Sequence, residues 1–177
     1  MSGDKAAVLI DNAYLQIDVI NKMNGRNGKF HLDYQEFSTN LCREIGAERF
    51  RTYIYDASED FQEDYFVSLS LQDRFEIRKG VFKDGKKGRQ QKQVDILLAI
   101  DMIRLALKNT VQHIILVSND SDFIPAVQFV KEEGIIVHLR HADNDTYSRK
   151  LSQTCDTSMA IRSGVLIEFD KKTGYRQ

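Results

Sequence analysis

Residues 113–123 read HIILVSNDSDF, an apolar run that changes abruptly into a polar one. The apolar part is rich in β-branched side chains and short enough to form a buried strand. The polar part brings two carboxylates, Asp120 and Asp122, to the end of that strand. In an open parallel sheet, ligands bind outside the carboxyl ends of the strands. This segment therefore predicts a strand of a parallel sheet that leads directly into a candidate site.

Similar apolar runs lie on both sides of this segment. Further buried strands are expected at residues 6–10, 50–55, 77–82 and 135–139. Apolar residues at helical spacing predict helices over residues 33–45, 60–75 and 94–108, and a fourth from Ser121 to Glu132 that ends before Gly134. Strands that alternate with helices predict an α/β fold, a three-layer sandwich with a central, mainly parallel sheet and right-handed crossovers.

Length and composition indicate one globular domain. The 177 residues are 42% hydrophobic and 29% charged, which excludes a collagen-like or largely disordered chain. The net charge of −1 gives no argument from overall charge for a nucleic acid or an anionic membrane as partner. Cys42 and Cys155 lie far apart without a surrounding Cys or His pattern, so we expect free thiols.

The hydrophobic segments are all short. None approaches the ~20 apolar residues that cross a bilayer, and the first residues lack the apolar stretch of a signal peptide. We therefore expect a cytoplasmic protein with no membrane partner.

Two further carboxylates are expected at the same edge of the sheet. Asp11 follows the strand at residues 6–10 directly, and it joins Asp120 and Asp122 if the first and fourth strands are neighbours. Asp95 opens the helix that leads back into the strand at 113–117. Because that helix runs antiparallel to the strand, its first turn lies at the same edge.

Such a cluster of acids favours a bound cation. Neighbouring carboxylates repel one another unless a cation lies among them, and oxygen ligands without His or Cys suit Mg²⁺ or Mn²⁺. A metal-activated water at such a site is typical of phosphoryl transfer or phosphodiester hydrolysis.

Each carboxylate also fits a purely structural role. Asp is among the best N-cap residues, so Asp11 fits as the cap of a helix over about residues 12–22, and Asp120 or Asp122 as the cap of the helix nearby. Asp95 in a first helical turn is favoured by the helix dipole. Asp101 lies six residues after Asp95 and thus on another face, where an ion pair with Arg104 is expected, so we leave Asp101 out of the site.

A basic segment precedes Asp95. Residues 78–92 carry seven basic side chains against one acid, and Gly85 and Gly88 favour a flexible loop. Such an arm beside a metal site predicts contacts with a phosphate backbone, although an ordinary solvated loop has the same composition. The candidate nucleic-acid-binding residues are Lys83, Lys86, Lys87, Arg89 and Lys92. His138 and His141 have no third ligand nearby in sequence, so we do not expect them to bind a metal.

The order of these motifs resembles a known family. A strand ends in Asp11-Asn12, Lys92-x-Val94-Asp95 follows with Asp101 after it, and then come residues 118–123, SNDSDF, a helix, Gly134 and a strand. This order is similar to the NYN domain, the branch of PIN-like nucleases that includes the LabA and DUF88 proteins. The likeness runs from about residue 6 to residue 160. It implies an NYN domain over residues 1–160, and we expect a C-terminal edge strand or tail over residues 161–177.

The resemblance also implies an activity and a site. It implies a PIN-like sandwich with an acidic Mg²⁺ or Mn²⁺ pocket and ribonuclease activity in the active members. The acidic set, both catalytic and metal-binding, is implied to be Asp11, Asp95, Asp120 and Asp122. Asn12 and Ser118 are implied to be supporting polar groups beside the metal or its waters.

Two positions depart from the family pattern. Asn119 stands where a Gly is usual, and Asn tolerates a left-handed backbone. Tyr14 stands where a second Asn often occurs in the first motif.

Three functions are therefore weighed. The first is a metal-dependent ribonuclease acting on single-stranded or structured RNA, in which Asp11, Asp95 and Asp120 bind the metal and Asp122 completes the pocket. The second is a catalytically weak RNA-binding or scaffold domain of the same fold. The third is a small-molecule phosphohydrolase. It ranks last because the basic segment offers more positive charge than a small substrate requires.

Overall fold

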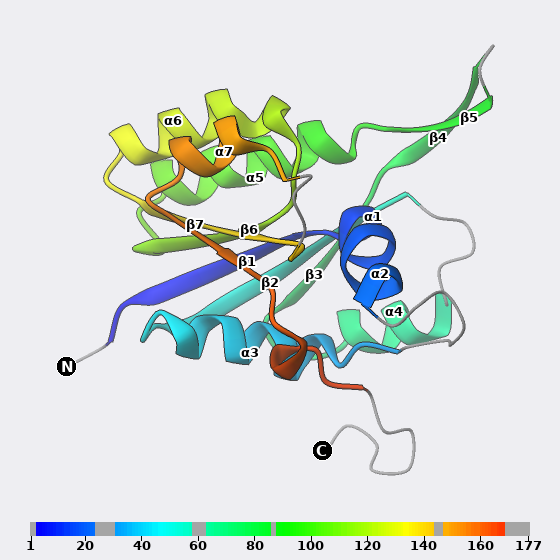
Figure 1. Cartoon of the computed structure of the whole chain (residues 1–177), viewed down its shortest axis with the longest axis horizontal. Coiled ribbons are helices and arrows are strands. Elements are labelled where there is room, and N and C mark those ends of the chain that lie inside the picture. Colours follow the sequence, from blue (N-terminus) through cyan, green and yellow to red (C-terminus); the bar gives the residue numbers. More distant parts are fainter. Residues whose placement is uncertain (1–2, 24–30, 58–62, 86–87, 144–146, 169–177) are drawn as a thin grey trace.

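The fold is built on a six-stranded sheet in which every neighbouring pair of strands is parallel (Figure 1). The computed structural model describes residues 3–23, 31–57, 63–85, 88–143 and 147–168, with the backbone alone at residues 23, 63–65, 81–85 and 88–92. The strands are β1 (Lys5–Asp11), β2 (Glu48–Asp56), β3 (Phe75–Lys79), β6 (His113–Val117), β7 (Ile136–His141) and β8 (Thr157–Ala160). Their order across the sheet is β3-β2-β1-β6-β7-β8. The order reverses between β1 and β6, which makes their carboxyl ends the switch point where open α/β sheets bind ligands.

Helices cover both faces of this sheet (Figure 1). On one face lie α3 (Tyr34–Glu44) and α4 (Glu63–Ser70), and on the other α5 (Val94–Leu107), α6 (Ile124–Glu132) and α7 (Arg149–Thr154). The chain leaves β1 through α1 (Asn12–Tyr14), a π-helical turn (Leu15–Ile20) and α2 (Asn21–Met23). A 3₁₀ turn (Ser121–Phe123) leads into α6. The predicted three-layer α/β sandwich is thereby confirmed.

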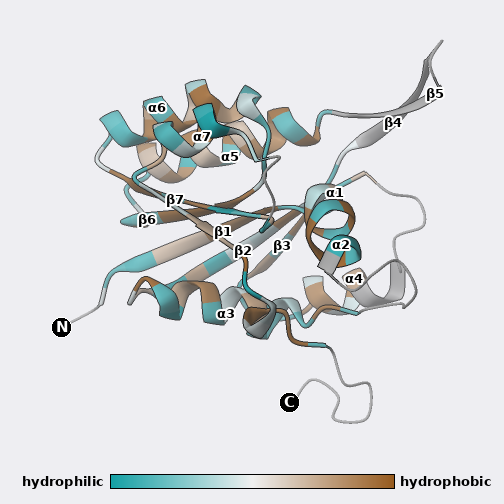
Figure 2. Cartoon of the chain, in the orientation of Figure 1, coloured by the Kyte–Doolittle hydropathy of each residue, from teal (hydrophilic) through white to brown (hydrophobic). Residues whose placement is uncertain are grey.

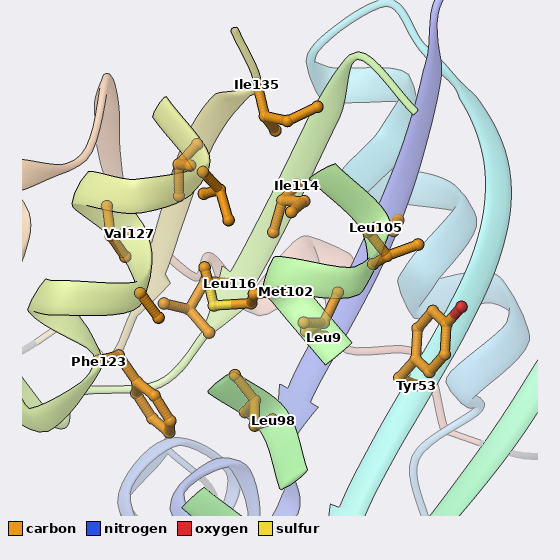
Figure 3. Close-up of a cluster of buried hydrophobic side chains, with 14 of the residues drawn as sticks. Leu9, Tyr53, Leu98, Met102, Leu105, Ile114, Leu116, Phe123, Val127 and Ile135 are labelled. Carbon is orange, nitrogen blue, oxygen red and sulfur yellow. The ribbon is translucent and has the colours of Figure 1, made fainter. Parts of the chain in front are cut away.

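The two central strands, β1 and β6, are apolar over residues 6–10 and 114–117 because both of their faces are covered there. Leu9 and Leu116 point into the cluster beneath α5 and α6, where Leu98 and Met102 pack on them (Figure 3). The alternate residues of the same strands, such as Val8 and Ile115, join the second cluster, beneath α3. The hydropathy colouring shows the same distribution, with apolar residues concentrated where helices and strands face each other (Figure 2).

The predicted strand at 77–82 divides into two elements. β3 ends at Lys79, and the chain then forms an antiparallel hairpin of β4 (Val81–Gly85) and β5 (Gly88–Lys92) that projects from the body (Figure 1). The main sheet offers no further partner here, because β2 ends at Asp56, which pairs with Lys79. The chain therefore pairs with itself, and the expected loop is largely a hairpin. Residues 86–87, between its two strands in the sequence, lie outside the described residues.

Other boundaries also differ from expectation. The predicted helix at 60–75 is shorter, because the chain turns after Ser70 and Phe75 begins β3. The edge strand β8 was not predicted, because its sequence, TSMA, is half-exposed and lacks an apolar run.

The segment after β8 docks against the body. A 3₁₀ turn (Ser163–Val165) follows, and the carbonyl of Ile167 accepts a hydrogen bond from the N–H of Asp33 at 2.8 Å. Leu32 and Glu168 form an isolated antiparallel bridge, so residues 163–168 add no strand to the main sheet. Phe169 and the residues after it lie outside the described part of the chain. No helix in the described part is long and apolar enough to cross a membrane.

Candidate functional site

The site forms where β1 and β6 end side by side. Ile10 pairs with Val117, so Asp11 and Ser118 are the next residues on the two strands. The Ser118 hydroxyl, which is fully buried, donates to Asp11 Oδ2 at 3.3 Å and accepts from the backbone N–H of Asp120 at the same distance. One hydroxyl thereby connects the end of β1 to the loop that carries Asp120 and Asp122.

The four predicted carboxylates are electrostatic neighbours. The pKa of Asp11 is raised to about 6, mainly by burial and also by the charges of Asp95 and Asp120, against the lowering effect of the Tyr14 N–H and the Ser118 hydroxyl. The pKa of Asp95 is raised by desolvation first and then by the charges of Asp120 and Asp122. The structure thus brings together side chains from three separate segments, as the strand and helix directions predict.

A hollow of about 270 Å³ lies beside Asp11. It is lined by Asp11, Ala13, Tyr14, Ile17, Asp18 and Asp95. Asp18 was not among the predicted site residues, although its spacing from Asp11 in the sequence could have placed it in the site. Residues 13, 14, 17 and 18 recur at helical spacing after Asp11, so a helix that begins there presents them on one side. Asp18 also forms an ion pair with Lys22 at 2.5 Å.

The structural roles predicted for Asp11 and Asp120 are present as well. Asp11 Oδ1 accepts from the N–H of Tyr14 at 3.2 Å and caps α1. Asp120 Oδ1 accepts from the N–H of Asp122 at 2.8 Å and caps the 3₁₀ turn. Capping fixes the direction of both carboxylates, and carboxylate oxygens have lone pairs left for further ligands. The two roles are therefore compatible.

The donor set fits a hydrated Mg²⁺ or Mn²⁺ ion better than an enclosed metal cage. Among the residues that the structure describes, no three His, Cys, Asp or Glu side chains stand close enough together to hold a metal ion by themselves. Mg²⁺ keeps several of its waters and uses one or two carboxylates together with substrate phosphates. Neighbouring aspartates with raised pKa values and oxygen ligands only are consistent with that mode of binding.

The comparison with known families agrees with this arrangement. The model of the NYN domain matches residues 5–162, which include the whole sheet and the four carboxylates. The chain belongs to the NYN domain family. NYN domains are part of the PIN-like nuclease superfamily, whose nucleases generally use divalent metal ions.

Two individual proteins are similar to this NYN domain. An uncharacterized protein of Sinorhizobium fredii, y4oD, is 37% identical over 86 residues, which is 48% of this chain and 36% of that protein. The chain thus matches about a third of the length of this relative. The crystal structure of a protein of unknown function from Vibrio parahaemolyticus has a TM-score of 0.69 at 22% identity, covering 94% of this chain and 98% of that one. This likeness shows the fold alone.

Asn12 lies apart from the Asp11 hollow of the NYN domain. Its amide Nδ2 donates to Asp56 Oδ2 at 2.5 Å, and its Oδ1 accepts from the hydroxyl of Tyr34. Asn12 and Asp56 are both buried. The resemblance implied a place beside the metal or its waters, whereas both polar ends of Asn12 are engaged by side chains of β2 and α3.

Asp56 is a carboxylate at the same sheet edge that was not predicted. It ends β2, next to β1, as Asp11 ends β1. The signal was available in the sequence, because Asp56 directly follows the apolar run at residues 50–55.

Asp101 has a structural role on the other side of α5. Its predicted ion pair with Arg104 is confirmed at 3.5 Å. The buried carboxylate also accepts from the hydroxyl of Tyr55 at 3.0 Å and from Arg78 Nε at 2.9 Å. Arg78, the first cation of the basic segment, is therefore tied to the body of the protein.

Three of the predicted nucleic-acid-binding residues lie on the strands of the hairpin. Lys83 is on β4, and Arg89 and Lys92 are on β5, where the structure describes the backbone alone. Lys86 and Lys87 lie outside the described residues. β5 ends one residue before the Gln93 cap of α5, so the hairpin is joined directly to the helix that carries Asp95.

Asn119 joins the site to α7 without a left-handed backbone. Its φ is not positive, in contrast to Arg74, Gln93 and Asn109, so the turn does not require glycine. The side-chain oxygen of Asn119 accepts from the N–H of Ser148, the cap of α7. This contact holds the loop that carries Asp120 and Asp122 against the N-terminus of α7.

Proposed function

We propose that this NYN domain is a metal-dependent ribonuclease that hydrolyses RNA phosphodiester bonds. One observation carries the proposal. Asp11 on β1 is hydrogen-bonded to Ser118 at the switch point of the sheet, and the charges of Asp95 and Asp120 act on it there. Membership of the NYN domain family supports a nuclease function. The repulsion among neighbouring carboxylates is the reason to expect a bound cation.

Each side chain has a defined part in this mechanism. Asp11, Asp95 and Asp120 would bind a hydrated Mg²⁺ or Mn²⁺ ion, in part through its waters, because no three described carboxylates stand close enough together to ligate it by themselves. Asp122 would complete the pocket. The ion supplies a nucleophilic water and neutralises charge on the phosphate. Ser118 holds Asp11 in position, and the Tyr14 N–H fixes the other oxygen of the same carboxylate.

The substrate is proposed to be single-stranded or structured RNA. The proposed contacts are Lys83, Lys86, Lys87, Arg89 and Lys92, of which Lys83 lies on β4 and Arg89 and Lys92 lie on β5, the strand that continues directly into α5. A phosphate backbone that follows the hairpin would reach Asp95 next. Such contacts weaken as salt increases, because counterions are released on binding.

The test is cleavage of a labelled oligoribonucleotide by purified protein. Wild type is assayed with Mn²⁺, with Mg²⁺ and with EDTA, beside Asp11→Asn and Asp120→Asn. Asp73→Asn, an exposed acid in the loop before β3, is the matched control. We expect Mn²⁺-dependent cleavage by wild type and by Asp73→Asn alone. Equal cleavage by all four proteins would identify a contaminant and overturn the proposal.

A catalytically weak RNA-binding domain is the second candidate. It is favoured by the lack, among the described residues, of three side chains close enough together to hold a metal ion. RNA binding that depends on the hairpin cations, with no cleavage in Mg²⁺, Mn²⁺ or Co²⁺, would establish this alternative.

A further inference from the structure

A second hollow lies at the opposite end of the sheet. It has a volume of about 450 Å³ and lies between the end of α3, the start of β2 and the loop before β3. Arg43, Arg49 and Arg74 line it together with Glu48 and Cys42. Arg49 pairs with Ala6, five residues before Asp11 on β1. At about 3.3 Å per residue, the arginine hollow lies roughly 17 Å from the acidic site along the strands.

The hollow carries more positive than negative charge. Arg74 Nη1 donates to Glu48 Oε1 at 3.0 Å, which neutralises one guanidinium, and also to the carbonyl of Arg49 at 2.9 Å. Arg43 donates to Asn40 Oδ1 at 2.5 Å, a neutral partner. The lining thus contains three arginines and a single carboxylate, so two positive charges remain.

Arg49 is the most confined of the three. Its guanidinium is stacked over the ring of Phe75, 4.8 Å from the centroid, and Nη1 donates to Thr52 Oγ1 at 3.2 Å. No carboxylate pairs with it among the described residues. Burial lowers the pKa of Arg49, and the nearby charge of Arg74 lowers it further. A partly desolvated cation beside a second one is costly unless an anion neutralises both.

We propose that the arginine hollow is a binding site for a phosphate monoester. Two unneutralised guanidinium charges match the charge of a phosphate monoester, about −1.5 to −2 at neutral pH. Guanidinium groups bind phosphate oxygens through two parallel hydrogen bonds. Arg49 Nη1 already donates to Thr52 Oγ1 and to the carbonyl of Arg74, so Nε and Nη2 are the atoms left for such a pair. The volume falls in the range of about 300–1,000 Å³ that is usual for small-ligand sites.

Two sources offer this chemistry, the 5′-phosphate of a nucleic acid and a small phosphorylated metabolite. Because the arginine hollow lies at the opposite end of the strands from Asp11, the proposal does not depend on catalysis at the acidic site. The two sites can therefore be tested separately.

The first experiment uses inorganic phosphate as the probe. Calorimetric titration and thermal unfolding are measured in EDTA, with sodium chloride at matched ionic strength as the reference. We expect phosphate to bind wild type and to raise its melting temperature. Arg43→Gln and Arg74→Gln should each weaken binding about tenfold or more, because each loses one charge-assisted contact. Arg43 is exposed, so its variant should fold normally.

Two further variants separate geometry from charge. Arg49→Lys keeps the charge but loses the planar fork, so it too should bind phosphate more weakly. Arg104→Gln makes the same charge change on α5, on the other face of the sheet, and should bind as wild type does. The proposal is overturned if phosphate gives no signal beyond that of chloride, or if Arg43→Gln, Arg74→Gln and Arg104→Gln all bind it equally.

A second experiment identifies the source. Binding of 5′-phosphorylated and 5′-hydroxyl oligoribonucleotides is compared in EDTA, together with a mononucleotide. Tighter binding of the 5′-phosphorylated strand that is lost in Arg43→Gln identifies a nucleic-acid end. Arg43-dependent binding of the mononucleotide, with no difference between the two strands, identifies a small phosphorylated ligand. If Arg43→Gln changes the binding of none of these probes, no phosphate monoester occupies the site.

Discussion

The hydroxyl of Ser118 donates a hydrogen bond to Asp11 Oδ2 across 107 residues of sequence, at a distance of 3.3 Å. Ser118 has no exposed surface, so this contact lies at the floor of the site. The same hydroxyl accepts the N–H of Asp120. The relationship between Ser118 and Asp11 therefore sets the position of two proposed metal-binding residues at once.

Replacing Ser118 tests this role directly. Ser118→Ala should slow metal-dependent cleavage by about tenfold, because Asp11 and the Asp120 loop lose their common partner, and should cost roughly 1 kcal/mol of unfolding free energy. Cleavage rates and urea unfolding measure the two effects. Ser121→Ala, an exposed serine in the same loop, is the control. An unchanged cleavage rate in Ser118→Ala would show that the hydroxyl does not position Asp11.

Metal binding should also stabilise the fold. On the proposed function, Mn²⁺ would bind the native state and not the unfolded chain, so it should raise the melting temperature of wild type in proportion to the logarithm of its concentration. Asp11→Asn keeps an N-cap residue but removes one ligand charge, so the shift should shrink strongly. Asp73→Asn should keep the full shift. Equal shifts in wild type and Asp11→Asn would place the ion elsewhere.

Asn12 is expected to matter for stability more than for chemistry. Asn12→Ala removes a buried donor to Asp56 and a buried acceptor from Tyr34, which should cost about 1–3 kcal/mol of unfolding free energy. Cleavage per folded molecule, measured well below the melting temperature, should change less than in Ser118→Ala. A stable Asn12→Ala protein without activity would instead support the place beside the metal that the family resemblance implied.

His138 should make the protein sensitive to acid. It lies in β7, bonded to His113 Nδ1 at 3.0 Å and to Thr157 Oγ1 at 2.8 Å. Its pKa is lowered from 6.5 to about 4, mainly by burial and also by the charges of His113 and Arg140, against the opposite effect of Asp156. His113 in turn faces Asp4 at 3.4 Å.

The sign of the pH effect follows from that lowered pKa. Between pH 6.5 and 4 the unfolded chain binds a proton at residue 138 that the native state does not, so acid favours unfolding. His138 should therefore lower the free energy of unfolding by roughly 2–3 kcal/mol as the pH falls through this window. His138→Gln should flatten the pH dependence of urea midpoints there, whereas His31→Gln, a control at a half-buried histidine before α3, should not. Identical pH profiles of wild type and His138→Gln would refute this assignment.

Much of the fold was predictable because its signals are local. The apolar run at residues 6–10 is fully buried in β1, and the run at 113–117 coincides with β6. Chain direction then explains the site, since strands that run the same way end at the same edge and α5 begins there. The grouping of Asp11, Asp95, Asp120 and Asp122 at one end of the sheet was therefore predictable without coordinates, while their catalytic and metal-binding roles stay predictions.

The sequence alone determined which residues form the buried strands and which carboxylates follow them, because strand and helix patterns depend on neighbours along the chain. Only the tertiary structure decided which strands pair, and so that Ser118 meets Asp11, that Asn12 turns towards Asp56, and that residues 81–92 form a hairpin. Those contacts join distant segments, and their choice depends on how all the side chains fill the space between sheet and helices. No local pattern records that arrangement.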